Sequence, residues 1–448
     1  MDFLIKEIES KLKAEEVYSL FKEELDSIFL DSSKEESEFS LYSFIGLNPF
    51  KKFTSKGREI CIDGETIFGD PFMKLEELIE KYKISYKSPI PFLGGAIGYF
   101  SYDIGRVIEK MPKSAKEDII IPDSYFLFYD NLIIFDLKKG KTYITALGMN
   151  KKSEESIKDI LKRIEDKPKR VDITLDRETY FNSNFTKEEY INAVKRLKDY
   201  IREGHTYIAN LTQRFSCDFN LDPFNTYMSL RSINKAPFSA YLNLEDFKII
   251  CSSPERFLKV FNRQVETRPI KGTRPRGKDE KEDELNKREL LNSEKDKSEL
   301  LMIVDLERND LSKVCKDFSV KVTELFKLEE YATVFHLVST VIGELEDGIT
   351  SVKCIRECFP GGSITGAPKI RSMEIIEELE GIRRGIYTGA IGYFDFRGNC
   401  DFNIVIRSIL TKDNKAYFGV GGGVTIESCE EMEYFETLDK AKALMRVL

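Results

Sequence analysis

The chain is short of the residues on which several common kinds of site depend. Its 448 residues include two histidines, His205 and His336, so a histidine-based metal site or a serine triad is nearly excluded. Eight cysteines are scattered without a Cys-x-x-Cys pair, which predicts reduced core thiols. There is no apolar run of about 18 residues and no signal-peptide core at the N-terminus, so we expect a cytoplasmic protein that does not contact membranes.

The sequence also lacks an excess of positive charge. A net charge of −8 spread over 33% charged residues describes an acidic protein with no basic surface for nucleic acid or anionic membranes. The 41% apolar residues are enough for a sizeable core. The length predicts one very large domain or two intimate ones.

The pattern along the chain suggests two regions, residues 1–150 and 183–448. Charges are dense from Lys151 to Arg177, a segment typical of a solvated helix followed by a linker. A capping box at Thr186–Glu189 then predicts the start of a helix. Further helices are expected at 278–306, 367–379 and 430–447, and strands at 240–242, 247–251, 387–396, 402–410 and 416–420.

One six-residue sequence, Gly-Ala-Ile-Gly-Tyr-Phe, occurs twice, at Gly95–Phe100 and at Gly389–Phe394. A match of this length is compatible with coincidence. It is also compatible with equivalent strands in two structurally related halves, and the sequence leaves both interpretations open.

Lys271 stands in the segment Pro269-Ile270-Lys271-Gly272-Thr273, which predicts a tight turn. A lysine is ordinarily a solvated surface charge. Here the neighbouring glycine lets backbone approach a ligand closely, and a lysine held beside apolar Ile270 can lose its proton and act as an amine nucleophile. The segment alone is compatible with either role.

Two sets of acidic residues share helix faces. Asp296 and Glu299 are three positions apart, and Glu433, Glu436 and Lys440 follow a spacing of i, i+3 and i+7. Carboxylates without histidine or cysteine suit Mg²⁺, a hard cation that prefers oxygen ligands. Ordinary solvated helix faces give the same spacing, so the pattern by itself does not decide.

A series of segments from about Phe92 to Lys440 resembles the chorismate-binding enzymes, which comprise anthranilate, aminodeoxychorismate, isochorismate and salicylate synthases. Most members carry alanine where this chain has Lys271, and lysine there is similar to the aminodeoxychorismate synthases. The resemblance implies an α+β fold in which two antiparallel β-sheets face one another with helices outside. It also implies that residues 1–150 and 183–448 interleave, the second region holding the chorismate site.

The resemblance carries roles to matching positions. It implies Mg²⁺ ligands at Glu299 and Glu436, with Glu433 and Asp296 nearby. Lys440 would offset the charge of a substrate carboxylate, and Glu255 would be the general acid for a leaving ring hydroxyl. The remaining matched positions surround the substrate: Gly272, Thr273, His336 and Thr365 at the ring, and Tyr387, Arg407 and Gly423 at the enolpyruvyl carboxylate.

The reaction implied is amination of chorismate to 4-amino-4-deoxychorismate, for p-aminobenzoate and folate synthesis. Lys271 would attack ring C2 as the 4-hydroxyl leaves, and ammonia would then add at C4 and expel the lysine. Relatives that use water carry a lysine base at the position of Ile208, so the water reaction is disfavoured. The alternatives are anthranilate synthase component I and, more remotely, a non-catalytic chorismate-binding regulatory module.

Two partners follow from the same resemblance. Ammonia needs a source, and the sequence has no Gly-x-Cys-x-Gly nucleophile elbow, so a separate glutamine amidotransferase subunit is expected as the other half of a heterodimer. Residues 29–33 and 42–46 resemble the family's tryptophan-binding region. Tryptophan is therefore a candidate ligand of the N-terminal region.

Overall fold

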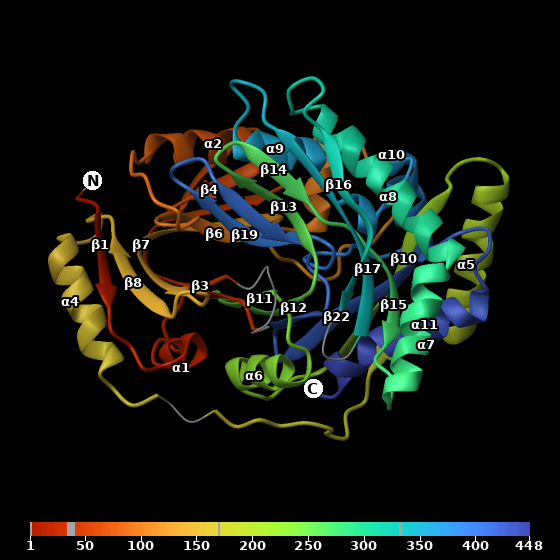
Figure 1. Cartoon of the computed structure of the whole chain (residues 1–448), viewed down its shortest axis with the longest axis horizontal. Coiled ribbons are helices and arrows are strands. Elements are labelled where there is room, and N and C mark those ends of the chain that lie inside the picture. The colour runs from red at the N-terminus through yellow and green to blue at the C-terminus, as the bar shows by residue number, and fades with distance from the viewer. Residues whose placement is uncertain (1, 34–40, 169–170, 331–333) are drawn as a thin grey trace.

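The computed structural model describes residues 2–33, 41–168, 171–330 and 334–448, and Figure 1 shows their arrangement. The helices are α1 Ala14–Ser19, α2 Pro71–Lys81, α3 Gly105–Ile108, α4 Ser153–Ile164, α5 Lys187–Arg202, α6 Pro223–Ile233, α7 Glu280–Asn292, α8 Glu294–Ser312, α9 Ser351–Cys358, α10 Lys369–Glu380 and α11 Glu430–Met445. Within those four ranges, none of the helices combines the length and apolar character that a bilayer crossing requires.

The strands are mostly antiparallel and short. They are β1 Leu4–Ile8, β2 Ser27–Asp31, β3 Tyr42–Lys56, β4 Glu59–Ile62, β5 Glu65–Phe68, β6 Gly95–Phe100, β7 Ser124–Asp136, β8 Lys141–Ala146, β9 Asn182–Ser183, β10 Ile208–Asp218, β11 Phe238–Asn243, β12 Lys248–Ser253, β13 Arg256–Phe261, β14 Gln264–Thr267, β15 Ile270–Pro275, β16 Lys321–Glu330, β17 Val334–Glu344, β18 Gly366–Ala367, β19 Ala390–Asp395, β20 Cys400–Asn403, β21 Ser408–Lys412 and β22 Lys415–Val424.

Alternating side chains along the strands define the layers. On β6, Ile97 and Tyr99 enter a central core, whereas Ala96 and Phe100 enter a second core that also contains residues of α2, α8 and α9. Because neighbouring strand residues point to opposite faces, β6 must lie between these two cores. The sheet that contains β6 therefore has helices on its outer face.

The second sheet repeats this arrangement on the other side of the central core. On β11, Ala240 and Leu242 enter the central core, whereas Tyr241 enters a third core shared with α1, α4, α6 and α11. The result is the expected α+β architecture of two facing antiparallel sheets with helices outside (Figure 1). The long strands β3 and β7 pair with one another and continue from one sheet into the other.

Strands from the two ends of the sequence are neighbours in both sheets. β2 pairs with β11, and β6 pairs with β19, so segments far apart in the chain share hydrogen bonds. The division of the chain at residues 150 and 183 stays a prediction.

The two copies of Gly-Ala-Ile-Gly-Tyr-Phe lie side by side. β6 and β19 pair antiparallel with Gly98 opposite Gly392, so the fourth residue of each copy faces the fourth residue of the other. Both glycines are sites of close approach: an added Cβ would lie 1.9 Å from the Tyr125 carbonyl oxygen at Gly98, and 2.0 Å from that of Asp401 at Gly392. The repeat therefore forms a locally symmetric strand pair at the middle of one sheet.

Several expected elements are confirmed and one is corrected. The capping box at Thr186 is present, with Thr186 Oγ1 accepting from the Glu189 amide at 3.2 Å. α10 and α11 cover most of the ranges expected for them. The strand expected at 402–410 is wrong, because pairing stops at Asn403 and resumes at Ser408, and Arg407 between them has a φ of +52°. A left-handed residue interrupts the regular pairing of a β-strand.

Candidate active site

Lys271 lies on a strand rather than in the expected turn. β15 pairs with β17, and the register shifts between Lys271 and Thr273, so Gly272 forms a bulge with a φ of +76°. An added Cβ on Gly272 would lie 2.8 Å from Leu290 Cδ1 and 3.0 Å from Asp296. Gly272 is thus required both by its backbone conformation and by the helices packed against β15.

The amine of Lys271 is enclosed by several strands. Its Nζ donates to the Ser363 carbonyl oxygen at 3.0 Å, and it lies 3.4 Å from where a Cβ on Gly423 would stand. Ile208 Cδ1 lies 3.1 Å from that same point. Ile208 therefore supplies an apolar wall where the water-using relatives are expected to have a lysine.

Burial lowers the pKa of the Lys271 ammonium from its ordinary value. The carboxylate of Glu299 opposes this shift and the positive charge of Lys440 adds to it. Arg274, on the same strand, pairs with Glu289 at 2.9 Å and with Asp296 at 3.2 Å. A buried lysine with a lowered pKa is chemically suited to act as a neutral amine.

Glu255 is a buried carboxyl group that interacts electrostatically with Lys271. Its side chain lies just before β13 and is 6% exposed. Burial raises its pKa, and the neighbouring Ser363, Lys271 and Lys440 each oppose that rise. Glu255 and Lys271 thus interact electrostatically and share Ser363 as a neighbour, the arrangement expected of an acid and an amine that serve one substrate.

Acidic side chains from α8 and α11 gather beside the glycine-rich strand β22. Glu433 and Glu436 both approach Gly422, where an added Cβ would lie 3.2 Å from Glu433 Oε2 and 3.3 Å from Glu436 Oε1. Lys295 of α8 reaches toward α11, with its Nζ 3.8 Å from Glu299 and 3.7 Å from Glu433. Glutamates of the two helices are therefore brought close to one another.

The electrostatics of these glutamates favour a cation. Burial raises the pKa of Glu299 to about 7, and burial together with Glu436 raises that of Glu433. Lys440, 2.7 Å from Glu436, lowers the pKa of that carboxyl, and its Nζ also donates to the Gly421 carbonyl at 2.8 Å. Repulsion and desolvation of this kind are relieved when a cation binds.

The residues fit Mg²⁺ by the chemistry of their oxygen donors, although they are not gathered as a complete ligand set. Throughout the described part of the chain, three or more acidic, histidine or cysteine side chains nowhere converge as a metal-binding group. Asp296, expected near the ligands, is engaged by Arg274 at 3.2 Å. Glu299, Glu433 and Glu436 are the residues available to hold the ion.

Arg407 has the features expected of an anion-binding arginine. Its left-handed backbone places it at the break between β20 and β21, and its Nη1 donates to Asn234 Oδ1 at 3.4 Å, a weak contact with a neutral group. Burial lowers the pKa of the guanidinium, and Tyr387 opposes that change. Tyr387 itself packs against Gly419, where an added Cβ would lie 2.2 Å from its ring.

The other matched residues divide by what their side chains contact. Thr273 Oγ1 and His336 Nδ1 are 3.0 Å apart across the β15–β17 pair. The buried Thr365 donates instead to the Gly361 carbonyl at 2.9 Å, so its hydroxyl holds the 361–365 turn. Sequence reasoning missed Ser363, whose carbonyl accepts from Lys271 and whose side chain hydrogen-bonds with Glu255. A single serine carries no sequence signal of either contact.

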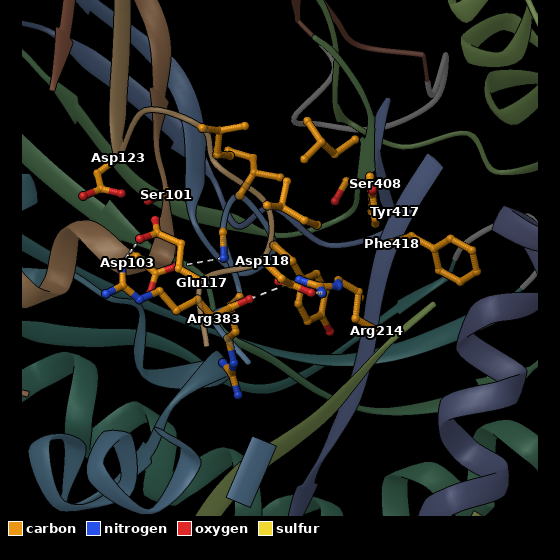
Figure 2. Close-up of a pocket in the computed structure, with 18 of the residues that line it drawn as sticks. Ser101, Asp103, Glu117, Asp118, Asp123, Arg214, Arg383, Ser408, Tyr417 and Phe418 are labelled. Carbon is orange, nitrogen blue, oxygen red and sulfur yellow. Dashed lines mark hydrogen bonds and ion pairs between the residues drawn. The ribbon is translucent and has the colours of Figure 1, made fainter. Parts of the chain in front are cut away.

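Tyr387 also lines a small pocket (Figure 2). Its volume is about 30 Å³. Ion pairs cross it: Arg383 lies 2.8 Å from Glu117, and Arg214 pairs with Asp118. The pocket is a region of ion pairs between the N-terminal region and strands β10, β21 and β22.

A larger cavity, of about 270 Å³, is lined by the end of β2, the start of β3 and residues of β11. Its walls include Asp31, Ser32, Tyr42 and Phe44, which belong to or adjoin the segments that resemble a tryptophan-binding region. Residues 34–40 between those segments lie outside the described ranges. The cavity is lined by aromatic side chains together with the buried Arg256.

Comparison with known proteins identifies the family of this chain. The model of the chorismate binding enzyme family matches residues 26–446. This chain belongs to the chorismate-binding enzymes. It is 40% identical over 421 residues to aminodeoxychorismate synthase component 1 of Bacillus subtilis, covering 91% of this chain and 89% of the relative.

Anthranilate synthases are about equally similar to this member of the family. It is 39% identical over 454 residues to anthranilate synthase component 1 of Acetivibrio thermocellus, covering 96% of this chain and 92% of the relative. The crystal structure of anthranilate synthase component I from Streptococcus pneumoniae superposes with a TM-score of 0.83 at 32% identity, covering 92% of this chain and 93% of that one. Overall similarity therefore does not separate the two activities.

Proposed function

We propose that this chain is the synthase component that converts chorismate and ammonia to 4-amino-4-deoxychorismate. The observation that carries the proposal is Lys271, a half-buried lysine whose pKa is lowered and which interacts with the buried Glu255. Alanine at this position, as in most of the family, would provide no nucleophile. Anthranilate synthase remains the competing activity, supported by the similar identity to anthranilate synthases.

The proposed mechanism is a double displacement. The neutral Lys271 amine forms a bond to ring C2, the ring double bonds shift, and the 4-hydroxyl leaves as water with the proton of Glu255. Ammonia then bonds to C4, the electrons shift back, and the C2–N bond to Lys271 breaks. Splitting the substitution in this way replaces one difficult step with two easier ones.

The remaining residues bind and orient the substrate. Arg407 and Tyr387 would hold the enolpyruvyl carboxylate with the backbone at Gly423, and Thr273 with His336 would contact the ring. Glu299, Glu433 and Glu436 would hold Mg²⁺, which supplies positive charge to the ring carboxylate when bound. Lys440 lies beside Glu436 and would add a second positive charge there.

Product analysis tests the proposal directly. The purified chain should consume chorismate with ammonium chloride and Mg²⁺, and p-aminobenzoate should form only after an aminodeoxychorismate lyase is added. Fluorescent anthranilate appearing without the lyase would instead identify the competing activity. Failure to consume chorismate under either condition would favour a non-catalytic binding role.

We also propose two partners. A glutamine amidotransferase subunit would deliver ammonia, so glutamine should support turnover only when such a subunit is added. The cavity near Ser32 and Phe44 would take tryptophan, with its ring against the aromatic walls. Isothermal titration with tryptophan, with Phe44→Ala as the variant expected to lose binding, tests this second assignment.

A further inference from the structure

Glu307 is a buried carboxyl group that the proposed mechanism does not use. It lies on α8, two turns beyond Glu299, and is 3% exposed. The nearby lysines serve a different acid: Lys313 lies 3.0 Å from Asp310, and Lys369 also pairs with Asp310. Burying a carboxyl group costs free energy unless its oxygens are hydrogen-bonded.

One oxygen of Glu307 holds the turn that contacts Lys271. Its Oε1 accepts from the Gly362 amide at 3.0 Å, and the next residue, Ser363, provides the carbonyl to which Lys271 Nζ donates. Gly362 is tightly fitted here, since an added Cβ would lie 2.9 Å from Glu307 Oε1. The position of the Ser363 carbonyl therefore depends on this contact.

The other oxygen reaches the segment that carries Glu255. Thr267 Oγ1 lies 3.4 Å from Glu307 Oε2 and 2.8 Å from the carbonyl oxygen of Phe257, two residues after Glu255. A hydroxyl has one proton, and the shorter contact takes it. The longer contact is then satisfied when Glu307 is protonated and donates to Thr267.

Other features agree with a protonated Glu307. Burial raises its pKa, the negative charge of Asp310 adds to the rise, and Lys369 opposes it. Glu255 also raises it, so the two buried acids are electrostatically linked. A neutral acid can accept from Gly362 with one oxygen and donate to Thr267 with the other.

We propose that Glu307 is a positioning residue that sets the Lys271 amine and the Glu255 carboxyl relative to one another. It acts through the Gly362–Ser363 turn on one side and through Thr267 and the Phe257 carbonyl on the other. The inference rests on the proposed function only in assigning Lys271 and Glu255 to the same reaction. A glutamate that served only the packing of α8 would stabilise the fold without affecting turnover.

The test compares Glu307→Gln with Glu307→Leu. Glutamine can accept from Gly362 and donate to Thr267, so its kcat for chorismate consumption should change by no more than about twofold. Leucine removes both contacts, and kcat should fall about 10- to 100-fold while KM stays similar, because misplacement of reacting groups mainly affects the chemical step. A Glu307→Leu variant with a lower Tm and an unchanged kcat would overturn the proposal.

A second pair of variants keeps the test decisive if Glu307→Leu does not fold. Gly362→Ala displaces the turn from the opposite side of the same contact, and Thr267→Val removes the other arm; each should lower kcat more than KM. Unchanged kcat in both would also overturn the proposal. Hydrogen exchange of residues 360–365, measured without chorismate, should be faster in Gly362→Ala than in the parent chain, so the contact is tested even if the parent chain consumes no chorismate.

Discussion

Lys271 Nζ and the carbonyl oxygen of Ser363 are 3.0 Å apart, and this hydrogen bond joins β15 to the turn that follows α9. The bond leaves the nitrogen lone pair of a neutral lysine free for a substrate. Burial favours the neutral form of the amine, and the neighbouring Glu255 can donate a proton to the leaving group.

The first prediction concerns the covalent role of Lys271. Chorismate supplied without ammonia should leave a slowly hydrolysing adduct, seen as a mass increase on the peptide containing Lys271. Lys271→Arg should be nearly inactive, because a guanidinium stays protonated and cannot attack. Lys271→Ala should lose amination, and high ammonia should rescue it poorly.

A purely electrostatic role gives the opposite pattern. Lys271→Arg would then keep much of the activity, and the parent chain would show no adduct. Lys278, an exposed lysine in the following segment, provides the matched control, since Lys278→Arg should leave turnover unchanged.

The second prediction concerns pH. Glu255 must be protonated to act as an acid, and its pKa is raised by burial, so activity should persist above the ordinary glutamate range and fall as pH rises through the raised value. Lys271 must be neutral, and its lowered pKa moves the rise of activity to lower pH. The profile of kcat/KM should therefore be bell-shaped.

Glu255→Gln should lower kcat by about 10²- to 10⁴-fold, since an amide cannot donate the proton to the leaving hydroxyl. The residual rate should also lose the limb assigned to Glu255. Glu289→Gln, which alters an exposed acid paired with Arg274, is the control and should keep the parent profile. A parent-like profile in Glu255→Gln would assign the acid elsewhere.

How much of this site was predictable from sequence depended on whether a side chain or the backbone does the work. Lys271 and the glutamates of α8 and α11 stood out by residue type and spacing, and the family resemblance gave them their roles and added Glu255. Ser363 contributes through its carbonyl, which has no side-chain signature, and through a side-chain hydrogen bond with Glu255 that exists only in the folded chain. The approach of Lys271, Glu255 and Ser363 to one another depends on long-range strand pairing, which local patterns do not specify.

The fold shows the same division. The capping box at Thr186 is a local signal and was confirmed, as were the long periodic helices. The segment around Gly272 was predicted as a tight turn and is a bulged strand, and the strand predicted at 402–410 ran through Arg407, whose left-handed backbone was missed. In each case the irregularity lies at the site, where the backbone must leave its strand to present a side chain.

The third prediction concerns the metal. Glu299→Gln and Glu436→Gln should each abolish turnover at limiting Mg²⁺ and weaken the binding of Mn²⁺, followed by paramagnetic resonance without substrate. The control is Glu431→Gln on the same helix as Glu436, which pairs with Lys187 at 2.6 Å on the surface. Parent-like turnover and Mn²⁺ binding in both variants would remove these glutamates from the metal site.

The fourth prediction concerns carboxylate binding by Arg407. Arg407→Lys should raise the chorismate KM by about 10-fold or more, because lysine lacks the bidentate fork. Arg263→Lys, at an exposed arginine that also has a left-handed φ, controls for the backbone strain. An unchanged KM in Arg407→Lys would mean that this arginine serves only the β20–β21 connection.

The last prediction concerns Ile208, whose side chain and the Lys271 amine both face Gly423. Ile208→Lys would introduce a second positive charge beside that amine in a partly buried site. The introduced lysine and Lys271 would repel each other, or one of them would lose its proton. Either outcome disturbs the arrangement that the ammonia reaction requires. We expect amination to fall at least about 10-fold, whereas Ile208→Leu, which keeps an apolar wall of the same volume, should stay near the parent rate. If the new lysine instead acts as a base for water, isochorismate should appear as chorismate is consumed in the absence of ammonia. Chromatography of the products distinguishes these outcomes, and amination by Ile208→Lys at the parent rate would show that this wall does not influence the choice of nucleophile.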